Sequence, residues 1–293
     1  MPKQETTGRS KKRRGRLRAK IIAWFLIPAA LISIAVALLT VYAYRRVTED
    51  LVLARTHDRT LLLANQLSPE LAAYPQRLAA LDGAAVPQAL QESWYADVQL
   101  FDGGLLLVDS AGRIVDAAPS RPELVGKRVP TALYEGSGAR YSNILDDLVP
   151  GQDVIALSWP GSNPERQGQG TLVGLFRAER RATRSSALYQ GIWDLYIGRR
   201  ETAYIVDGNG RVIFNPDTFT IGEDFSSQEP VRRALRGESG AVRTRDGENR
   251  QVVAGFAPVP GTPWGLVVEV SWNDLIQTSR PYTRFLVALL ALG

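Results

Sequence analysis

The sequence predicts an α+β fold in which a long N-terminal helix precedes two similar modules, each built on one antiparallel sheet. Three observations lead to this prediction. A stretch without a charged side chain, residues 21–44, lies near the N-terminus. Helical periodicity continues beyond it. A hairpin sequence then occurs twice, 98 residues apart, and strand-like segments follow each copy.

The N-terminal region predicts a basic cytoplasmic tail, residues 1–20, and a transmembrane helix, residues 21–44. The tail holds nine Lys or Arg and one Glu, and its place beside the apolar stretch argues against a nucleic-acid-binding arm. At about 1.5 Å per residue, the stretch is long enough for the roughly 30 Å core of a bilayer. Basic flanks stay in the cytoplasm, so residues 45–284 are expected outside the inner (plasma) membrane. A signal peptide cleaved after Ala35–Ala37 is the alternative, although the apolar stretch is longer than such peptides need.

Residues 45–93 predict a long helix, continuous with the membrane helix, and a helical cap. The helix carries an apolar stripe that includes Val47, Leu51, Ala54 and Leu61. A stripe of this kind needs cover, which predicts a homodimer through the helix. Pro69 lacks an amide hydrogen and predicts an interruption, with a second short helix over residues 71–83.

The repeat defines two modules, residues 94–197 with a connecting helix and residues 198–272. Three residues of the first hairpin match three of the second at one offset: Asp109, Gly112 and Arg113 match Asp207, Gly210 and Arg211. In the closing strands we align Gly174 with Gly265, which makes residues 162–170 an inserted loop.

Each module is expected to contain about five strands with helices packed on them. The first predicts strands at 98–101, 105–109, from Arg113, and at 141–144, 152–161 and 171–176, with helices at 131–135 and 177–196. The second predicts strands at 202–206, 211–214, 240–244, 250–258 and 264–270, with helices at 229–236 and 272–279.

Residues 273–293 predict an exit helix and the start of a second transmembrane helix. The apolar run 285–293 is too short to cross a bilayer alone. We expect the chain to be part of a longer protein; a minor interfacial helix is the alternative.

This order of elements resembles the double Cache sensor domain of bacterial transmembrane receptors, whose modules are PAS-like. The resemblance covers residues 45–284 and is carried by Tyr204–Asp207, Gly210–Val212, Pro216–Asp217, Ile221–Gly222, Gly237–Gly240 and Trp264–Leu266. It implies an extracytoplasmic small-molecule sensor of a histidine kinase, cyclase or chemoreceptor. The membrane-distal module, 94–197, would hold the ligand, and a cytoplasmic effector would follow this chain. Asn215 stands where many members have His, and the constellation of amino-acid-binding members is not found, which argues against an α-amino-acid ligand.

Candidate ligand-binding residues are aromatic and polar side chains expected on the sheets, because small-molecule sites combine apolar walls with a few polar groups. In the first module they are Arg128, Tyr134, Tyr141, Asp153 and Trp159. In the second they are Tyr204, Asn215, Phe256 and Trp264. Core packing is the alternative role for each aromatic residue.

The composition argues against an enzyme. The chain has no Cys and one His, His57, on the polar side of the predicted helix, so thiolate metal sites and a Ser-His-Asp triad find no support. Asp146 and Asp147 could hold calcium, but a solvated loop is favoured. We expect no catalytic residue, cofactor or resident metal. An envelope-anchored binding or adhesion module without signalling output is the alternative function.

Overall fold

The computed structural model describes residues 11–83, 100–136, 138–160, 170–178, 188–190, 192, 201–215 and 220–277. The chain divides into two compact units, residues 1–51 with 280–293, and residues 52–279. The expectations for residues 98–99, for most of the connecting helix and for the chain after residue 277 lie outside the described residues.

Helix α1, Lys11–Gly83, is continuous, so the predicted interruption at Pro69 is wrong. Proline in a helix costs about 3 kcal/mol. Here the same helix face stays buried on both sides of Pro69, with Ala64 and Leu67 before it and Leu71 after it. Packing of that face outweighs the local cost. Among the described residues, no helix is both long and apolar enough to cross a membrane.

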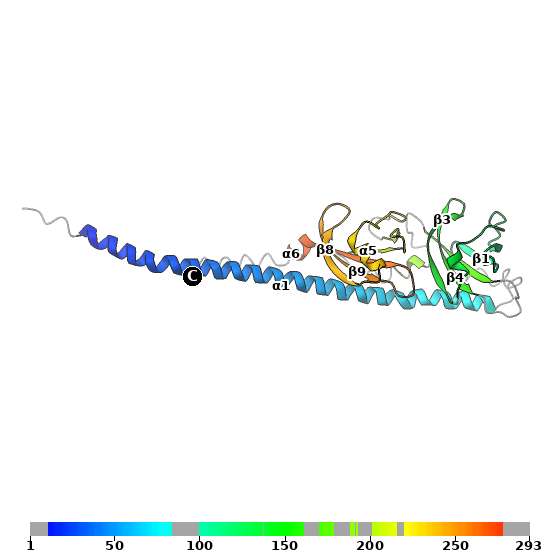
Figure 1. The fold of residues 1–293 in the computed structure, drawn as a ribbon, viewed down its shortest axis with the longest axis horizontal. Coiled ribbons are helices and arrows are strands. Elements are labelled where there is room, and N and C mark those ends of the chain that lie inside the picture. The colour runs from blue at the N-terminus through cyan, green and yellow to red at the C-terminus, as the bar shows by residue number, and fades with distance from the viewer. Residues whose placement is uncertain are drawn as a thin grey trace, which may run out of the picture. The chain divides into compact units, whose positions relative to one another are not determined.

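The first sheet has five antiparallel strands in the order β2-β1-β5-β4-β3 and is drawn mainly in green in Figure 1. They are β1 (Gly104–Val108), β2 (Ile114–Ala118), β3 (Arg140–Val149), β4 (Gln152–Pro160) and β5 (Thr171–Arg177). A short 3-10 helix, η1 (Thr131–Leu133), lies where a brief helix was predicted. The strand expected to end at Phe101 is not formed at its described residues: Leu100 and Phe101 lie in a turn before β1. Strand β3 is longer than predicted, so Asp146 and Asp147 lie on a strand and not in a loop.

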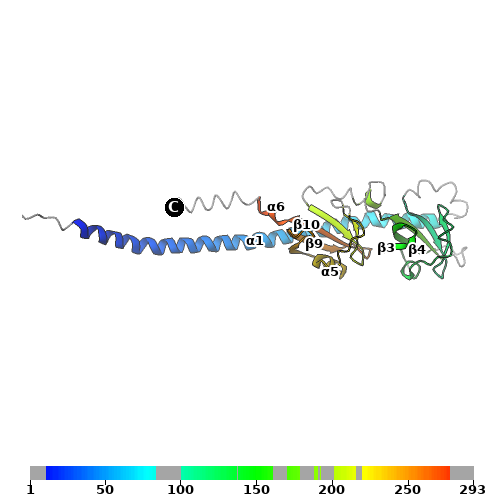
Figure 2. The ribbon, with the colours of Figure 1, turned by 90° about the horizontal axis from the view of Figure 1, so that it is seen from above.

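The second sheet has the same plan, in the order β7-β6-β10-β9-β8. Its strands are β6 (Glu201–Val206), β7 (Val212–Phe214), β8 (Gly240–Arg245), β9 (Gln251–Pro258) and β10 (Gly265–Ser271). Helix α5 (Glu229–Leu235) packs on it, and α6 (Trp272–Gln277) follows β10 (Figure 2). The prediction of an α+β fold with a long helix and two antiparallel sheets is therefore confirmed.

Strand register corrects the alignment of the closing strands. Gly174 pairs with Leu105, and the residue 98 positions after Leu105 is Ala203, which pairs with Val268. Gly174 therefore corresponds to Val268, an offset of 94, and its alignment with Gly265 is wrong. Two similar apolar-glycine segments allowed the slip, since sequence alone does not show which residues face each other.

One aspartate turn explains why the hairpins repeat. In each copy the Asp Oδ1 accepts two backbone N–H groups: those of Ala111 and Arg113 for Asp109, and those of Asn209 and Arg211 for Asp207. The fourth residue of each turn is a glycine at positive φ, a conformation that costs other residues more. Asp246 builds a third such turn between β8 and β9, with Asn249 at the positive-φ position.

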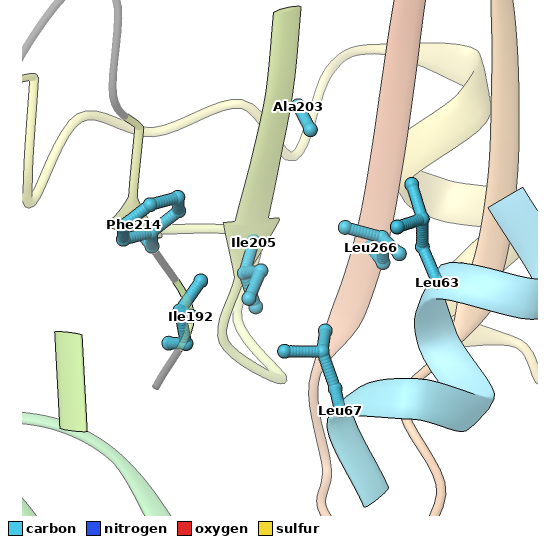
Figure 3. Close-up of a pocket in the computed structure, with 7 residues that line it drawn as sticks. All are labelled: Leu63, Leu67, Ile192, Ala203, Ile205, Phe214 and Leu266. Carbon is cyan, nitrogen blue, oxygen red and sulfur yellow. The ribbon is translucent and has the colours of Figure 1, made fainter. Parts of the chain in front are cut away.

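Helix α1 packs along one face of both sheets and shares their largest apolar core. Gly255 on β9 permits the close approach, since a Cβ there would meet Thr60 and the backbone oxygen of Thr56 at 2.9 Å. The Thr60 hydroxyl donates to the Thr56 carbonyl at 2.7 Å, so its burial leaves no donor unpaired. A small apolar void of about 30 Å³ remains nearby, where Leu63 and Leu67 face Leu266 (Figure 3).

The two sheets are joined through an irregular stretch of β3. Its pairing with β4 shifts between Tyr141 and Ile144, which releases backbone groups from the ladder. The Ile144 N–H donates to Asp207 Oδ2 at 3.0 Å, and the Ser142 carbonyl accepts from Trp264 Nε1 at 3.1 Å. The interruption of one sheet thus supplies hydrogen bonds to the other.

Candidate ligand-binding site

A cavity of about 800 Å³ lies against the second sheet, on the face that also carries α5. Its walls come from strands β6, β9 and β10, from the turn between β8 and β9, and from the segment before α5. A volume of this size is in the range of small-molecule sites. The second module therefore contains a space in which a small ligand would fit.

Tyr204, Gln228 and Glu269 form a hydrogen-bonded group in the wall of this cavity. The Tyr204 hydroxyl lies 2.7 Å from Gln228 Oε1 and 3.1 Å from Glu269 Oε1. The hydroxyl has one hydrogen, so it donates to one of these two oxygens at a time: to Glu269 when that carboxyl is ionised, and to Gln228 when Glu269 is protonated. A protonated Glu269 completes the group, because its carboxyl O–H can donate to the tyrosine oxygen.

The electrostatics of this group agree with that arrangement. Burial raises the pKa of Glu269 to about 7, against a hydrogen bond from Tyr204 that lowers it. Burial and the neighbouring Glu269 raise the pKa of Tyr204 well above 10, so its hydroxyl stays protonated. The carboxyl changes charge near neutral pH while the phenol does not.

The cavity walls are rich in carboxylates. Five acidic side chains line the cavity, with a single basic side chain among its lining residues, Arg250. The acidic residues are Glu223, Asp246, Glu248, Glu269 and Asp274. Arg250 is already paired with Asp246 at 2.7 Å and with Glu248 at 3.0 Å. The remaining field in the cavity is therefore negative.

Two of the four second-module candidates line this cavity, Tyr204 and Asn215. Phe256 lies in the core beneath α5, where the Arg233 guanidinium sits 4.6 Å from its ring centroid. Trp264 lies in the core shared with α1, with its ring centroid 4.9 Å from that of Tyr141. Both aromatic side chains fill core positions and are not among the lining residues.

The five first-module candidates lie on both faces of the first sheet. Tyr141 and Trp159 pack in the core on the α1 face, and the Tyr141 hydroxyl donates to the Leu71 carbonyl at 2.7 Å. Tyr134 packs on the opposite core. Arg128 is exposed, and Asp153 is half-buried. The Trp159 Nε1 is buried and has no hydrogen-bond partner among the described residues. As ligand-binding residues, these five stay a prediction.

Sequence reasoning missed Glu269, although a signal was present. Glu269 is the one charged residue in the strand Gly265–Ser271, between Val268 and Val270. A carboxylate within a strand that is otherwise apolar is costly unless it has a role or a partner. The cavity also depends on the turn at Asp246, which the repeat did not reveal.

Other candidate chemistry finds ordinary partners. Asp146 forms an ion pair with Arg211 at 2.7 Å. His57 lies 3.4 Å from the Ser239 hydroxyl. Within the described part of the chain, no group of three or more His, Asp or Glu side chains is placed to hold a metal ion.

A family model described as a Cache domain matches residues 48–279. The fold is similar to that of the ligand-binding domain of the Pseudomonas fluorescens chemoreceptor CtaA in complex with L-isoleucine, with 15% identity and a TM-score of 0.55 over 81% of this chain and 98% of that chain. It is also similar to the extracellular domain of rpHK1S-Z16, described as a candidate histidine kinase, with 10% identity and a TM-score of 0.54 over 76% and 95%. A third similar structure is the ligand-binding domain of the Pseudomonas aeruginosa amino acid chemoreceptor PctB in complex with L-Gln, with 16% identity and a TM-score of 0.51 over 80% and 98%. At these identities the likeness concerns the fold. A comparison with curated proteins found no match.

Proposed function

The chain belongs to the Cache domain family, and on this premise we propose that it is the extracytoplasmic small-molecule sensor domain of a bacterial signal-transduction receptor. The observation that carries the proposal is the family match over residues 48–279 together with the cavity of about 800 Å³ in the second module. Cache domains are sensor and ligand-binding modules, and we assign no catalytic role to this one.

The junction between the sheets supports transmission of a signal. A ligand outside a cell acts inside it only by binding two arrangements of the protein with different affinity. Backbone groups of β3 bond to Asp207 and Trp264 of the second module, and α1 packs on both sheets. A conformational change in either module would therefore alter its contacts with the other module and with α1.

We also propose that residues 21–44 anchor the chain in the inner membrane and that α1 pairs with a second copy. The anchor is supported by the charge-free sequence and by its exposed apolar side chains, such as Trp24 and Leu38. The pairing is supported by the stripe at Val47, Leu51 and Leu61, which is exposed in the single chain. A cytoplasmic effector of kinase, cyclase or chemoreceptor type would receive the signal.

Because the chain has no cysteine, single cysteines test the anchor and the pairing cleanly. We expect Ser110→Cys to react with a membrane-impermeant maleimide in intact cells and Ser10→Cys to react only after permeabilisation. We expect Leu51→Cys to form a disulfide-linked dimer on mild oxidation. The opposite labelling pattern would refute the proposed orientation, and a monomer on oxidation would refute the proposed pairing at this stripe.

The sensor function is tested by screening the purified chain against pools of organic acids, amines, sugars and nucleobases. A ligand that binds the folded state raises the midpoint of thermal unfolding. We expect at least one pool to raise it in a concentration-dependent manner. If no pool does so, the proposed ligand-sensing function loses its support.

A further inference from the structure

We propose that the second-module cavity binds a small organic cation, an amine or a guanidinium compound, whose charge pairs with the carboxylate of Glu269. This inference rests on the proposed sensor function and names its ligand class. The first support comes from the duplication, because the paired strands β6 and β10 of the second sheet correspond in register to β1 and β5 of the first.

The counterparts of Tyr204 and Glu269 are leucines. Leu105 pairs with Gly174 in the first sheet, as Ala203 pairs with Val268 in the second. The residues that follow these four are therefore also equivalent between the modules. Leu106 corresponds to Tyr204, and Leu175 corresponds to Glu269. Leu106 and Leu175 are buried in a closed aliphatic core. The sheet folds without a polar pair at these positions, so the pair in the second module is not a requirement of the fold. A half-buried carboxyl in an otherwise apolar strand, which the fold does not need, is costly, and a ligand contact accounts for it.

The chemistry around this pair fits a cation. Tyr204 and Phe225 line the cavity with their ring centroids 5.3 Å apart at 90°, and aromatic faces attract ammonium and guanidinium groups. Gln228 adds an amide oxygen to the same wall. An aromatic wall with a carboxylate and a neutral acceptor offers complementary contacts to a protonated nitrogen.

The same walls disfavour an anion. The basic side chain among the lining residues, Arg250, is held by the Asp246 and Glu248 carboxylates at 2.7 and 3.0 Å. An anionic ligand would have to displace one of these while lying close to Glu223 and Glu269. Like charges in a partly buried site repel strongly, so the cavity discriminates by charge.

The test measures binding of agmatine and putrescine to the full chain in detergent by isothermal titration calorimetry. 1,4-Butanediol and succinate serve as the neutral and anionic compounds of similar length. We expect both cations to bind at pH 8, with no binding of butanediol or succinate. Glu269→Gln keeps the shape and removes the charge, and we expect it to weaken cation binding at least tenfold. Glu135→Gln removes an exposed carboxyl from the first module and is expected to leave binding unchanged.

A pH series separates the role of Glu269 from a general effect of charge. Glu269 faces Tyr204 and Gln228, and it feels Asp246 and Arg250 of the β8–β9 turn. Its carboxyl ionises near pH 7, so we expect agmatine to bind about tenfold more weakly at pH 6 than at pH 8. Glu269→Gln should bind equally at both.

Three outcomes would overturn the inference. They are cation binding that Glu269→Gln leaves unchanged, succinate binding in the same cavity, and a chain that binds pooled acids or sugars but neither cation. The last outcome would leave the sensor function standing. Failure of every pool would remove both. The double variant Tyr204→Leu, Glu269→Leu copies the first module and keeps the test valid if Glu269→Gln folds poorly, since the double variant should abolish cation binding in a folded chain.

Discussion

Replacement of Glu269 by glutamine should make the fold more stable at alkaline pH and barely change it at acidic pH. The carboxyl has a pKa of about 7 in the fold and 4.5 as its ordinary value. The folded state therefore holds this proton more tightly than the unfolded chain does. Well below pH 4.5 both states are protonated and the group has no effect; as pH rises from about 4.5 to about 7, only the unfolded state ionises and stability is lost. Each pKa unit corresponds to about 1.4 kcal/mol, so the loss approaches about 3 kcal/mol.

The assay is urea unfolding of residues 46–279, followed by tryptophan fluorescence, for the parent chain and Glu269→Gln. We expect the free energy of unfolding to rise by about 3 kcal/mol at pH 8 and by about 1 kcal/mol at pH 5. Other titrating groups are common to both proteins and cancel in the difference. An equal change at the two pH values would refute the reasoning, because it would mean that the carboxyl has the same pKa in both states.

Two further substitutions have matched controls. Asp207→Ala should lower the free energy of unfolding in urea by about 1–3 kcal/mol more than Asp109→Ala does, which is about the cost of one buried unpaired donor. The reason is that Asp207 also accepts the N–H of the buried residue Ile144. Equal losses for the two variants would argue against the junction between the sheets. Gly255→Ala should destabilise by about 1–3 kcal/mol because its Cβ would collide with α1. Gly247→Ala, which meets open space, should stay within about 0.5 kcal/mol, and similar effects of both would contradict the close packing of α1.

The fold was predictable where the sequence repeats or alternates. The spacing of Asp109 and Asp207 predicted two modules, because the aspartate turn uses only residues near in sequence. The continuity of α1 through Pro69 was not predictable locally, since it depends on burial against residues distant in sequence, from Phe101 onward. The same limit produced the slip at Gly174, whose partner is fixed by pairing across strands.

The candidate site was predictable only in part. Tyr204 and Asn215 stand out as polar or aromatic residues beside an apolar run, and both line the cavity. Phe256 and Trp264 have the same local appearance, yet tertiary packing places them in the core. Among the residues of the site, Glu269 has a pKa that burial raises to about 7. That burial arises from neighbouring strands, which sequence periodicity does not identify.

Gly255 forms a notch under α1, and the notch restricts how the helix can slide. A screw movement of α1 by one residue, about 1.5 Å along its axis with a turn of about 100°, would bring Arg59 or Leu61 over a position that now holds Thr56 and Thr60. Moving it by four residues, about 6 Å, would bring Thr56 or Ala64, which are equally small. Rotation of the helix against the second sheet is therefore opposed by side-chain bulk, and a shift of about one turn is the step that keeps a small side chain over Gly255.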